Sequence, residues 1–595
     1  MRIVIIDSGL ALQLQKESYV SACYQLSRKD DETVIETGCE DVIGHGTGIY
    51  GIIRNGLADP DTEIVIVKVT ESEEEVVNEQ VLIDAMCFVR DTLRPDIVNL
   101  SLCVRAAQHQ AEMYSICKEL TENQTVLVAA FDNGGAVSYP AAFDCVVGVT
   151  SEPSITSSDR FVPVQNTYVN VLAKGRVQRL LWKDGKPIIG WGDSLATAHF
   201  TRILSNQCYH SQCTPQEALK QLGVYMQPEE TQQKQLPDWV AAPLRAAVFP
   251  YNKEMHSVVR YSEMMHIQLQ DIYDVRRSGK VGKSITTSLG AQYQIKNIAQ
   301  IDYDEIDVLI VGHLAELSMI DQSFSAVELI LDALAHGRKV YSLDTYNHPK
   351  IREFAQQGDF FSPQIQIDPA ELVPMGKLFI NSVPVVGVFG TRSRQGKFTL
   401  QMELRSRLLA DHYRVAQLGT EPTAYLFGMD ACYHFGYNGN RALHSESQKL
   451  AYINLLLHRM EQGNPDIMLS GSQSQTITST IGNIGGFALD QYTFLLGLQP
   501  DIVILAVCYE DTPSYISATV RFLESAVDCR VIGAVMFPFK LVADHKTDTL
   551  ISDLEYEEFC VNLRNHCPLL LPVYRLEKQT DLDALYQRMI DSFCE

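Results

Sequence analysis

The feature that most constrains the fold of this chain is a regular alternation of short apolar runs with longer amphipathic segments. Buried strands are predicted at Arg2–Ile6, Glu63–Val69, Asp96–Leu102, Thr125–Ala130 and Cys145–Val149. The segments Val77–Leu93 and Ala106–Asn123 between them have the apolar spacing of helices. Strands and helices in alternation predict an α/β fold, in which a parallel sheet carries helices on both faces.

The length of the chain predicts several domains. With 595 residues it exceeds what one hydrophobic core supports. The apolar periodicity breaks at 226–244, a stretch rich in glutamine and proline, which we expect to be a linker after a first domain at 1–225. Two further α/β domains are expected at 245–375 and 376–595.

Charge and composition narrow the classes of partner and the compartment. A net charge of −24 argues against general binding of nucleic acid or an anionic membrane, because both require a basic face. No apolar stretch approaches the about 18 residues of a membrane-spanning helix, and we expect neither a signal peptide nor a propeptide. The 14 cysteines form no CxxC pair, which fits reduced thiols. We therefore expect a cytoplasmic protein without a metal site built on its cysteines, and we assign no residue as a metal ligand from the cysteine pattern.

A serine at the start of a predicted helix lies within Trp191–Phe200. Gly192 allows a close approach of the backbone just before Ser194, and apolar residues mark the buried side of the helix that follows. A hydroxyl at the positive end of a helix favours an oxyanion forming beside it, which is typical of a nucleophile.

Three residues upstream provide the partners that such a nucleophile requires. Asp7 ends the first predicted strand, and chemistry in parallel sheets lies at the carboxyl ends of strands. His45 begins a helix flanked by glycines, and Asn133 follows the fourth strand with an amide that suits a developing oxyanion. The order Asp, His, Ser along the chain differs from the order of triads on other folds.

At these residues the chain, from 1 to about 225, resembles the subtilisin family of serine peptidases. The matching motifs, in the family's order, are Asp7-Ser8-Gly9, Gly44-His45-Gly46-Thr47, Asn99-Leu100-Ser101-Leu102, the segment around Asn133, Tyr139-Pro140-Ala141-Ala142 and Gly192-Asp193-Ser194-Leu195-Ala196. The resemblance implies that Asp7 orients His45, that His45 takes the proton of Ser194, and that Ser194 attacks the scissile carbonyl. It also implies that Asn133 and the backbone N–H of Ser194 hold the oxyanion.

A peptidase must present the scissile bond in a regular geometry, so we expect an extended peptide to bind along 99–104. The residues expected to bind the substrate are Asn99, Ser101, Leu102 and Cys103. This stretch lacks the glycines that usually let a peptide lie flat in the family, which predicts a narrow range of substrates.

Two residues near the nucleophile depart from the family pattern. Asp193 stands where the family has Thr or Ser, and Ala198 replaces a proline. The Asp193 carboxylate either stabilises protonated His45 and raises its pKa, or it caps the helix.

The alternative to an active enzyme is an inactive peptidase fold used as a scaffold, but no member of the triad is lost, which favours catalysis.

The second domain has the alternation of a Rossmann-like fold. It begins at 245–252 and continues through the strand Asp307–Val311, the helix Ser325–Ala335 and the strand Lys339–Leu343. The GxGxxG fingerprint is absent from it. The basic stretch Gly279–Lys283 is either an anion site or a plain loop.

The third domain opens with a strand, a glycine loop, a lysine and a helix. This is the context of a phosphate-binding loop, in which backbone N–H groups hold phosphates and Lys397 neutralises them. The residues expected to bind a nucleotide are Gly390, Thr391, Arg392, Arg394, Gly396, Lys397 and Thr399. The loop has one residue more than usual between its glycines and resembles that of dethiobiotin-synthetase-like ATPases, so we expect a P-loop NTPase-like domain. A degenerate loop kept for the fold is the alternative.

The usual magnesium ligands of such a site are displaced or missing. Phe398 follows the lysine directly, so Thr399 would take the metal-binding role, and the strand Asp466–Leu469 does not end in an acidic residue. Glu421 and Glu510 are the substitute candidates. ATP or another nucleotide with Mg²⁺ is therefore a candidate cofactor of the third domain, whereas peptide hydrolysis requires none.

From about 245 onward the chain also resembles peptide maturation system proteins encoded beside clostridial, ribosomally made natural-product peptides. The matching segments are 248–253, 260–263, 279–283 and 390–399. The resemblance implies a precursor peptide as substrate and other maturation enzymes of the same gene cluster as partners, and it leaves the oligomeric state open.

Together these features predict a cytoplasmic serine endopeptidase that cleaves a ribosomally synthesised precursor peptide. The nucleotide-binding module would recognise or modify the peptide or gate access to it. One alternative is an ATP-dependent ligase or kinase that uses the peptidase fold to dock the peptide. The other is a non-catalytic assembly scaffold.

Overall fold

The computed structural model describes most of the chain, which divides into two compact units. The described residues are 1–594 apart from 30–31, 71–77, 106–107, 166–167, 226–235, 288–289, 315–316, 318–323, 364–375, 436–442, 479–488, 541–548 and 568. Unit 1 comprises Met1–Gln232 and Ala370–Ser382, and unit 2 comprises Gln233–Pro369 and Val383–Glu595. Most of the expected linker, 226–235, lies outside the described residues. The described residues 376–382, which fall in the range expected for the third domain, group with unit 1.

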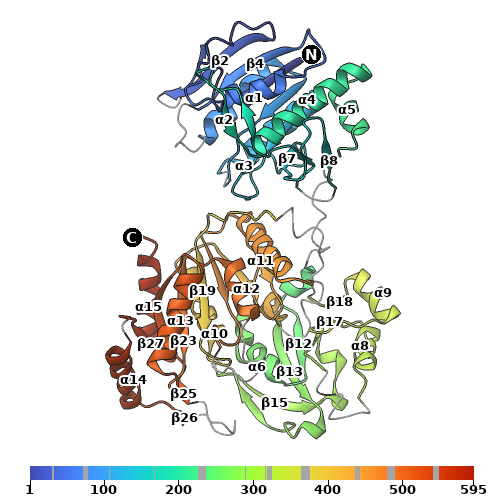
Figure 1. The fold of residues 1–595 in the computed structure, drawn as a ribbon. Coiled ribbons are helices and arrows are strands. Elements are labelled where there is room, and N and C mark those ends of the chain that lie inside the picture. The colour runs from blue at the N-terminus through green and yellow to red at the C-terminus, as the bar shows by residue number, and fades with distance from the viewer. Residues whose placement is uncertain are drawn as a thin grey trace. The chain divides into compact units, whose positions relative to one another are not determined.

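A nine-stranded sheet with the order β3-β2-β4-β1-β5-β6-β7-β9-β8 forms the centre of unit 1 (Figure 1). Its strands are β1 Arg2–Asp7, β2 Val20–Lys29, β3 Glu32–Thr37, β4 Glu63–Lys68, β5 Ile97–Leu100, β6 Val126–Ala130, β7 Val147–Ser151, β8 Phe161–Pro163 and β9 Val171–Ala173. Neighbours from β2 to β9 pair in parallel, and only the edge strands β3 and β8 are antiparallel. The apolar runs form this sheet because both of its faces are buried.

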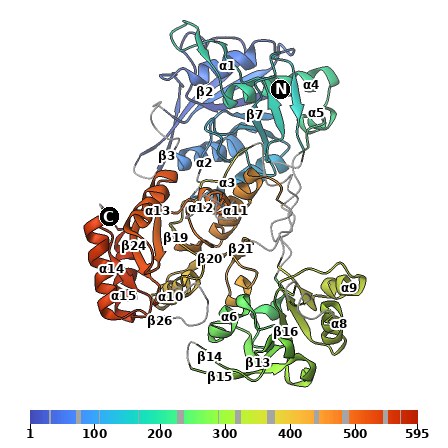
Figure 2. The ribbon, with the colours of Figure 1, turned by 60° about the horizontal axis from the view of Figure 1, so that its bottom comes forward.

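Helices cover both faces of the unit 1 sheet. The helices are α1 His45–Arg54, α2 Glu79–Phe88 with the π-helical turn Val89–Leu93, α3 Gln110–Glu122, α4 Asp193–Ser211 and α5 Pro215–Gln221. Helices α1 and α4 lie side by side, and their apolar residues pack with Ile3 and Ile5 of β1. Helices α2 and α3 form a second pair (Figure 2). A small hairpin joins β10 Gln178–Leu180 to β11 Ile188–Gly190.

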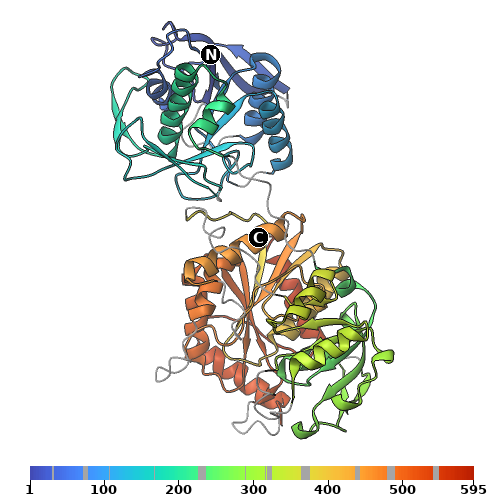
Figure 3. The ribbon, with the colours of Figure 1, turned by 90° about the vertical axis from the view of Figure 1, so that its right-hand side faces the viewer.

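Unit 2 contains two seven-stranded sheets flanked by helices (Figure 3). The first has the order β14-β15-β13-β12-β16-β17-β18, with β12 Arg245–Phe249, β13 Gln268–Asp274, β14 Ser284–Thr286, β15 Gln292–Asn297, β16 Val308–Val311, β17 Lys339–Ser342 and β18 Phe360–Phe361. The second has the order β21-β20-β22-β19-β23-β24-β27, with β19 Val385–Gly390, β20 Val415–Gly419, β21 Ala431–Cys432, β22 Ile467–Gly471, β23 Ile502–Val507, β24 Arg530–Met536 and β27 Val573–Arg575.

The helices of unit 2 cover these sheets and help to join them. They are α6 Lys253–Arg260, α8 Ala326–Ala335, α9 Pro349–Gln357, α10 Lys397–Ala410, α11 Glu446–Glu461, α12 Leu489–Leu498, α13 Pro513–Ala526, α14 Asp553–His566 and α15 Gln579–Asp591. Short 3₁₀ turns lie at Asp238–Ala241, Ser262–Met264, Arg276–Ser278, Ile298–Gln300, Tyr303–Glu305 and Ala424–Phe427, and β25 Phe539–Lys540 pairs with β26 Thr549–Leu550. Val248 of β12, in the first sheet, shares a core with Met402 of α10 and Phe427 of the turn Ala424–Phe427, which lie beside the second sheet.

The expected α/β class with predominantly parallel sheets is confirmed. The strands of the two sheets of unit 2 lie within 245–361 and 385–575. In the described part of the chain, no helix combines the length and the hydropathy needed to cross a bilayer.

Candidate active site

The residues predicted as a triad lie on elements that meet at one edge of the unit 1 sheet. Strands β1 and β5 are parallel neighbours in which Ile6 pairs with Leu100. Asp7 therefore ends β1 at the same edge at which Ser101 follows β5. Helices α1 and α4, which pack side by side, begin at His45 and Asp193, so their first turns carry His45 and Ser194.

Asp7 and His45 form a direct hydrogen bond. The Nδ1–H of His45 donates to Asp7 Oδ1 at 2.7 Å, and the backbone N–H of Ser8 donates to the same oxygen at 2.7 Å. Asp7 is buried, whereas the side chain of His45 is 34% exposed. A carboxylate accepts only, so in the neutral imidazole the proton lies on Nδ1 and the lone pair on Nε2. His45 is thus prepared to act as a base through Nε2.

The pKa of His45 is raised above its ordinary value. Burial lowers it, but the charge of Asp7, the hydrogen bond to Asp7 and the charge of Asp41 together raise it by more. Both carboxylates therefore stabilise the imidazolium that forms when His45 accepts a proton. The carboxylate of Asp193, which we considered as a source of such a shift, is directed elsewhere.

Asp41 binds the backbone at the start of α1, the helix that begins at His45, and sequence reasoning missed this residue. Its Oδ1 accepts hydrogen bonds from Gly44 N–H at 2.6 Å, Ser8 Oγ at 2.9 Å and Ile43 N–H at 3.1 Å. Its Oδ2 accepts from the N–H and the hydroxyl of Thr47 at 2.8 and 2.6 Å. A buried carboxylate thus satisfies the free N–H groups that open α1. The available signal was an acidic residue just ahead of a glycine-flanked helix start.

Ser194 lies at the start of α4, and its hydroxyl donates to the carbonyl oxygen of Ser101 at 3.0 Å. The hydroxyl of Ser101 in turn reaches the carbonyl oxygen of Ser194 at 3.2 Å. Within the described residues, the Ser194 hydroxyl is therefore bonded to a backbone carbonyl rather than to His45. A rotation about the Cα–Cβ bond of Ser194 releases it from that carbonyl.

The amide of Asn133 is oriented by the backbone of α4. Its Oδ1 accepts the N–H of Asp193 at 2.8 Å. Because a backbone N–H only donates, the amide oxygen must face it, which turns the Nδ2 donor to the other side. A β-carbon on Gly192 would lie 2.8 Å from this oxygen, and the φ of Gly192 is 140°. The close approach expected at Gly192 is therefore that of Asn133.

The side chain of Asp193 neither caps α4 nor points at His45. Its Oδ2 accepts the hydroxyl of Thr150 at 2.6 Å, its Oδ1 accepts the N–H of Ser151 at 2.8 Å, and Gly192 is the N-cap residue. Lys377 Nζ lies 3.5 Å from Oδ2. Sequence reasoning missed Lys377, since nothing local to Asp193 signals a cation so far along the chain.

The stretch predicted to bind substrate divides into buried and accessible parts. Asn99 is fully buried, and its amide donates to the hydroxyl of Thr201 at 2.9 Å, which joins β5 to α4. Leu102 and Cys103 are half-buried, and in the described part of the chain their backbone groups form no backbone–backbone hydrogen bond. Val104 is paired with Tyr139 through two backbone bonds of 2.9 and 2.8 Å. The open backbone edge is therefore confined to 102–103.

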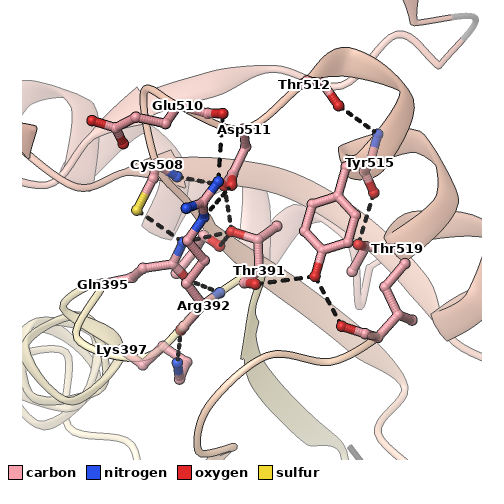
Figure 4. Close-up of polar contacts among 12 residues, drawn as sticks. Thr391, Arg392, Gln395, Lys397, Cys508, Glu510, Asp511, Thr512, Tyr515 and Thr519 are labelled. Carbon is pink, nitrogen blue, oxygen red and sulfur yellow. Dashed lines mark hydrogen bonds and ion pairs between the residues drawn. The ribbon is translucent and has the colours of Figure 1, made fainter. Parts of the chain in front are cut away.

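The expected phosphate-binding loop has the predicted context, strand β19 followed by a loop and helix α10, but its interior is filled by its own side chains (Figure 4). Gln395 Oε1 accepts the N–H of Arg392 at 2.7 Å, and Gln395 Nε2 donates to Thr391 Oγ1 and Cys508 Sγ. Thr391 and Arg392 both bond to Asp511. One backbone donor that a phosphate would use is therefore engaged within the loop.

Lys397 and Thr399 also have partners within unit 2. Lys397 is buried, and its Nζ donates to the carbonyl oxygens of Arg392 at 2.7 Å and Ser474 at 3.0 Å. The hydroxyl of Thr399 accepts from Tyr261 OH at 2.6 Å, so the proposed metal-binding role has a competing partner. Gly396 is required by a positive φ of 72° and by Leu576, whose Cδ2 would lie 2.4 Å from an added β-carbon. Arg394 has a left-handed φ of 62°.

Comparison with known proteins finds fold likenesses only. No family model and no curated protein matches the chain. Similar solved structures include the S41 psychrophilic protease (18% identity, 37% of this chain and 81% of that chain, TM-score 0.32) and the epidermin leader peptide processing serine protease of Staphylococcus aureus (16%, 37% and 68%, 0.30). A DUF1611 family protein of Anabaena variabilis is 15% identical over 58% of this chain and 99% of that chain, with a TM-score of 0.42. Likenesses at this level assign no function to the chain.

Proposed function

We propose that unit 1 is a serine endopeptidase with Ser194 as nucleophile, His45 as general base and Asp7 as the acid that orients the imidazole. The observation that carries the proposal is the 2.7 Å hydrogen bond between His45 Nδ1 and Asp7 Oδ1. It lies at the sheet edge where the first turn of α4 carries Ser194. An oriented imidazole beside a hydroxyl at a helix start is the arrangement that nucleophilic catalysis requires.

In the acylation step, the hydroxyl of Ser194 leaves the carbonyl of Ser101 and transfers its proton to His45 Nε2. Its Oγ then bonds to the carbonyl carbon of the substrate, and the tetrahedral intermediate carries the negative charge. The imidazolium is stabilised by Asp7 directly and by Asp41 at longer range, which is the electrostatic pattern that raises the His45 pKa. His45 then returns the proton to the departing amine, which breaks the peptide bond.

The oxyanion is held by two donors in this proposal. The N–H of Ser194 belongs to the first turn of α4, where backbone donors have no partner within the helix. The Nδ2 of Asn133 is the second donor, since the Oδ1 of that amide is fixed by Asp193 N–H. Preorganised donors of this kind contribute more than groups that must reorient during the reaction.

We infer that the substrate is a ribosomally made precursor peptide bound in extended form. The open backbone of Leu102 and Cys103 suits strand addition by such a peptide, and Val104, paired with Tyr139, limits its length of contact. The resemblance of 245–595 to peptide maturation system proteins supports this substrate class. Cytoplasmic location and other maturation enzymes as partners belong to the same proposal.

The cleavage test uses the full chain and candidate precursor peptides. Mass spectrometry of each peptide after incubation is expected to show two fragments whose masses sum to the intact peptide plus one water. The Ser194→Ala variant is expected to produce neither fragment. Equal cleavage by wild type and Ser194→Ala would refute the assignment of the nucleophile.

A second proposed function is nucleotide binding at the loop 390–399, favoured by the position of Lys397 at the start of α10 directly after the strand and loop. Binding requires Lys397 to exchange its two carbonyl partners for phosphate, and Gln395 to release the N–H of Arg392. A ligase or kinase acting on the peptide would consume ATP in step with peptide modification. ATP loss that depends on added peptide and stops in Lys397→Ala is the result expected of that activity.

A further inference from the structure

A short segment from the middle of the chain packs onto the peptidase unit beside its oxyanion site. Residues 376–382 follow the first sheet of unit 2 in sequence and precede β19, yet they group with unit 1. The N–H of Val137 donates to the carbonyl oxygen of Leu378 at 2.9 Å, and Ala136 and Leu378 form a parallel bridge. The ring of Phe379 packs edge-on against Tyr168, with 5.6 Å between centroids.

This segment carries Lys377 into the interior of unit 1. The side chains of Lys377 and Asp193 are each 6% exposed, and Lys377 Nζ lies 3.5 Å from Asp193 Oδ2. Asp193 also accepts hydrogen bonds from Thr150 and Ser151, but neither supplies a charge. Since the burial of a charged group is costly unless a charge of opposite sign lies near it, Lys377 is the partner that balances Asp193 directly beside Ser194.

Lys377 also bridges the two elements that form the proposed oxyanion site. Its Nζ lies 5.0 Å from the ring centroid of Phe131, a distance at which the ring attracts an ammonium. Phe131 follows β6 and precedes Asn133 by two residues, whereas Asp193 opens α4 immediately before Ser194. The ammonium group of Lys377 therefore contacts both the segment that carries Asn133 and the segment that carries Ser194.

Asp193 links Lys377 to Asn133, because its carboxylate contacts Lys377 and its backbone N–H bonds to Asn133. The carboxylate of Asp193 is fixed by Thr150, Ser151 and Lys377, and its backbone N–H donates to Asn133 Oδ1 at 2.8 Å. A shift of Asp193 must therefore move the amide whose Nδ2 is proposed to bind the oxyanion. The same shift displaces Ser194, the next residue in the chain.

We propose that Lys377 is a positioning residue of the peptidase: by balancing Asp193 it fixes Asn133 and Ser194 in their catalytic places, and docking of 376–382 is required for full activity. The inference rests on the proposed serine peptidase function. Lys377 acts through Asp193 and touches neither the substrate nor the reacting atoms.

The test compares four variants of the full chain: Lys377→Met, Lys377→Arg, Lys377→Met/Asp193→Asn and Lys220→Met. Lys220 is an exposed lysine of α5 and serves as the matched control. The readouts are kcat and KM for the cleaved peptide, the rate of labelling by a serine-directed fluorophosphonate, and Tm. The kinetic constants are calculated from the concentration of folded protein, so that a loss of stability alone does not change them.

Lys377→Met is expected to lower kcat and the labelling rate by about 10- to 100-fold with little change in KM. A displacement of catalytic groups by about 1 Å lowers reaction rates by factors of this order. Lys377→Arg and Lys377→Met/Asp193→Asn are expected to recover most of the loss, the first by restoring the charge and the second by removing the carboxylate that needs it. Asparagine can still bond to Thr150 and Ser151.

Three results would overturn the inference: wild-type kcat in folded Lys377→Met, no recovery in the double variant, or an equal loss in Lys220→Met. Failure of the underlying function is distinguished by Ser194→Ala. If that variant still cleaves, the peptidase assignment itself is wrong. If it is inactive while Lys377→Met is fully active, only the role of Lys377 is wrong.

Discussion

Replacing Asp7 by asparagine tests the electrostatics of the proposed site most sharply. Asp7 Oδ1 accepts from both Ser8 N–H and His45 Nδ1–H, and asparagine keeps the size of the side chain while removing its charge. Two effects are expected. The catalytic rate falls because the imidazolium loses its nearest counter-charge and the tautomer of His45 is no longer fixed; the equivalent change in a Ser-His-Asp enzyme costs about 10⁴-fold in kcat.

The second effect of Asp7→Asn is on pH dependence. In the wild type the His45 pKa is raised, because Asp7 and Asp41 outweigh the lowering by burial. Catalysis requires neutral His45, so the acidic limb of kcat/KM is expected above about pH 6.5, the ordinary histidine value. Without the charge of Asp7, burial dominates and the limb shifts to lower pH.

The assay is a pH profile of kcat/KM with the cleaved peptide for wild type, Asp7→Asn and the exposed control Asp61→Asn. Stability provides a second readout with a defined sign. A raised pKa in the folded state contributes stability that is fully present below the unfolded value of about 6.5 and is lost as pH rises through the folded value. The Tm deficit of Asp7→Asn is therefore expected to be largest at acidic pH. An acidic limb that stays in place in Asp7→Asn would refute the reasoning.

Three further predictions concern the residues around the two candidate sites. Asn133→Ala is expected to lower kcat by about 10²- to 10³-fold with KM unchanged in steady-state assays, as for loss of one oxyanion donor; an increase in KM alone would contradict this role. Asp41→Asn is expected to lower the free energy of unfolding by about 2–4 kcal/mol in urea titrations, because a buried, charged acceptor of the α1 N–H groups is lost; unchanged stability would contradict it. Gln395→Ala is expected to strengthen ATP binding in calorimetry and Lys397→Ala to abolish it, whereas equal affinities would leave the loop without a nucleotide role.

The parts of the site that sequence could predict are those with local signals. Asp7 follows an apolar run that had to end at a sheet edge, and the glycines on both sides of His45 are visible in the sequence itself. Only the structure shows why one of them is needed: a β-carbon on Gly46 would lie 2.4 Å from the carbonyl oxygen of the distant residue Gly9. Gly192 likewise signalled a close approach, although only the structure shows that Asn133 is the group that approaches.

The parts that could not be predicted depend on contacts between distant segments or on side-chain conformations. Lys377 contacts Asp193 only because residues 376–382, which lie between two parts of unit 2 in sequence, pack onto unit 1. No local sequence pattern indicates this packing. The motif around Lys397 was recognisable from strand, glycine and helix signals. That Gln395 turns inward and occupies the N–H of Arg392 is a matter of side-chain conformation, which the motif does not encode.

The most direct test of the central claim is labelling of the intact chain with a fluorophosphonate, followed by peptide mapping of the modified residue. The account predicts stoichiometric labelling at Ser194 that rises with pH as His45 loses its proton and that is absent in Ser194→Ala. Failure of the folded protein to react, or modification of any other serine in place of Ser194, would contradict it.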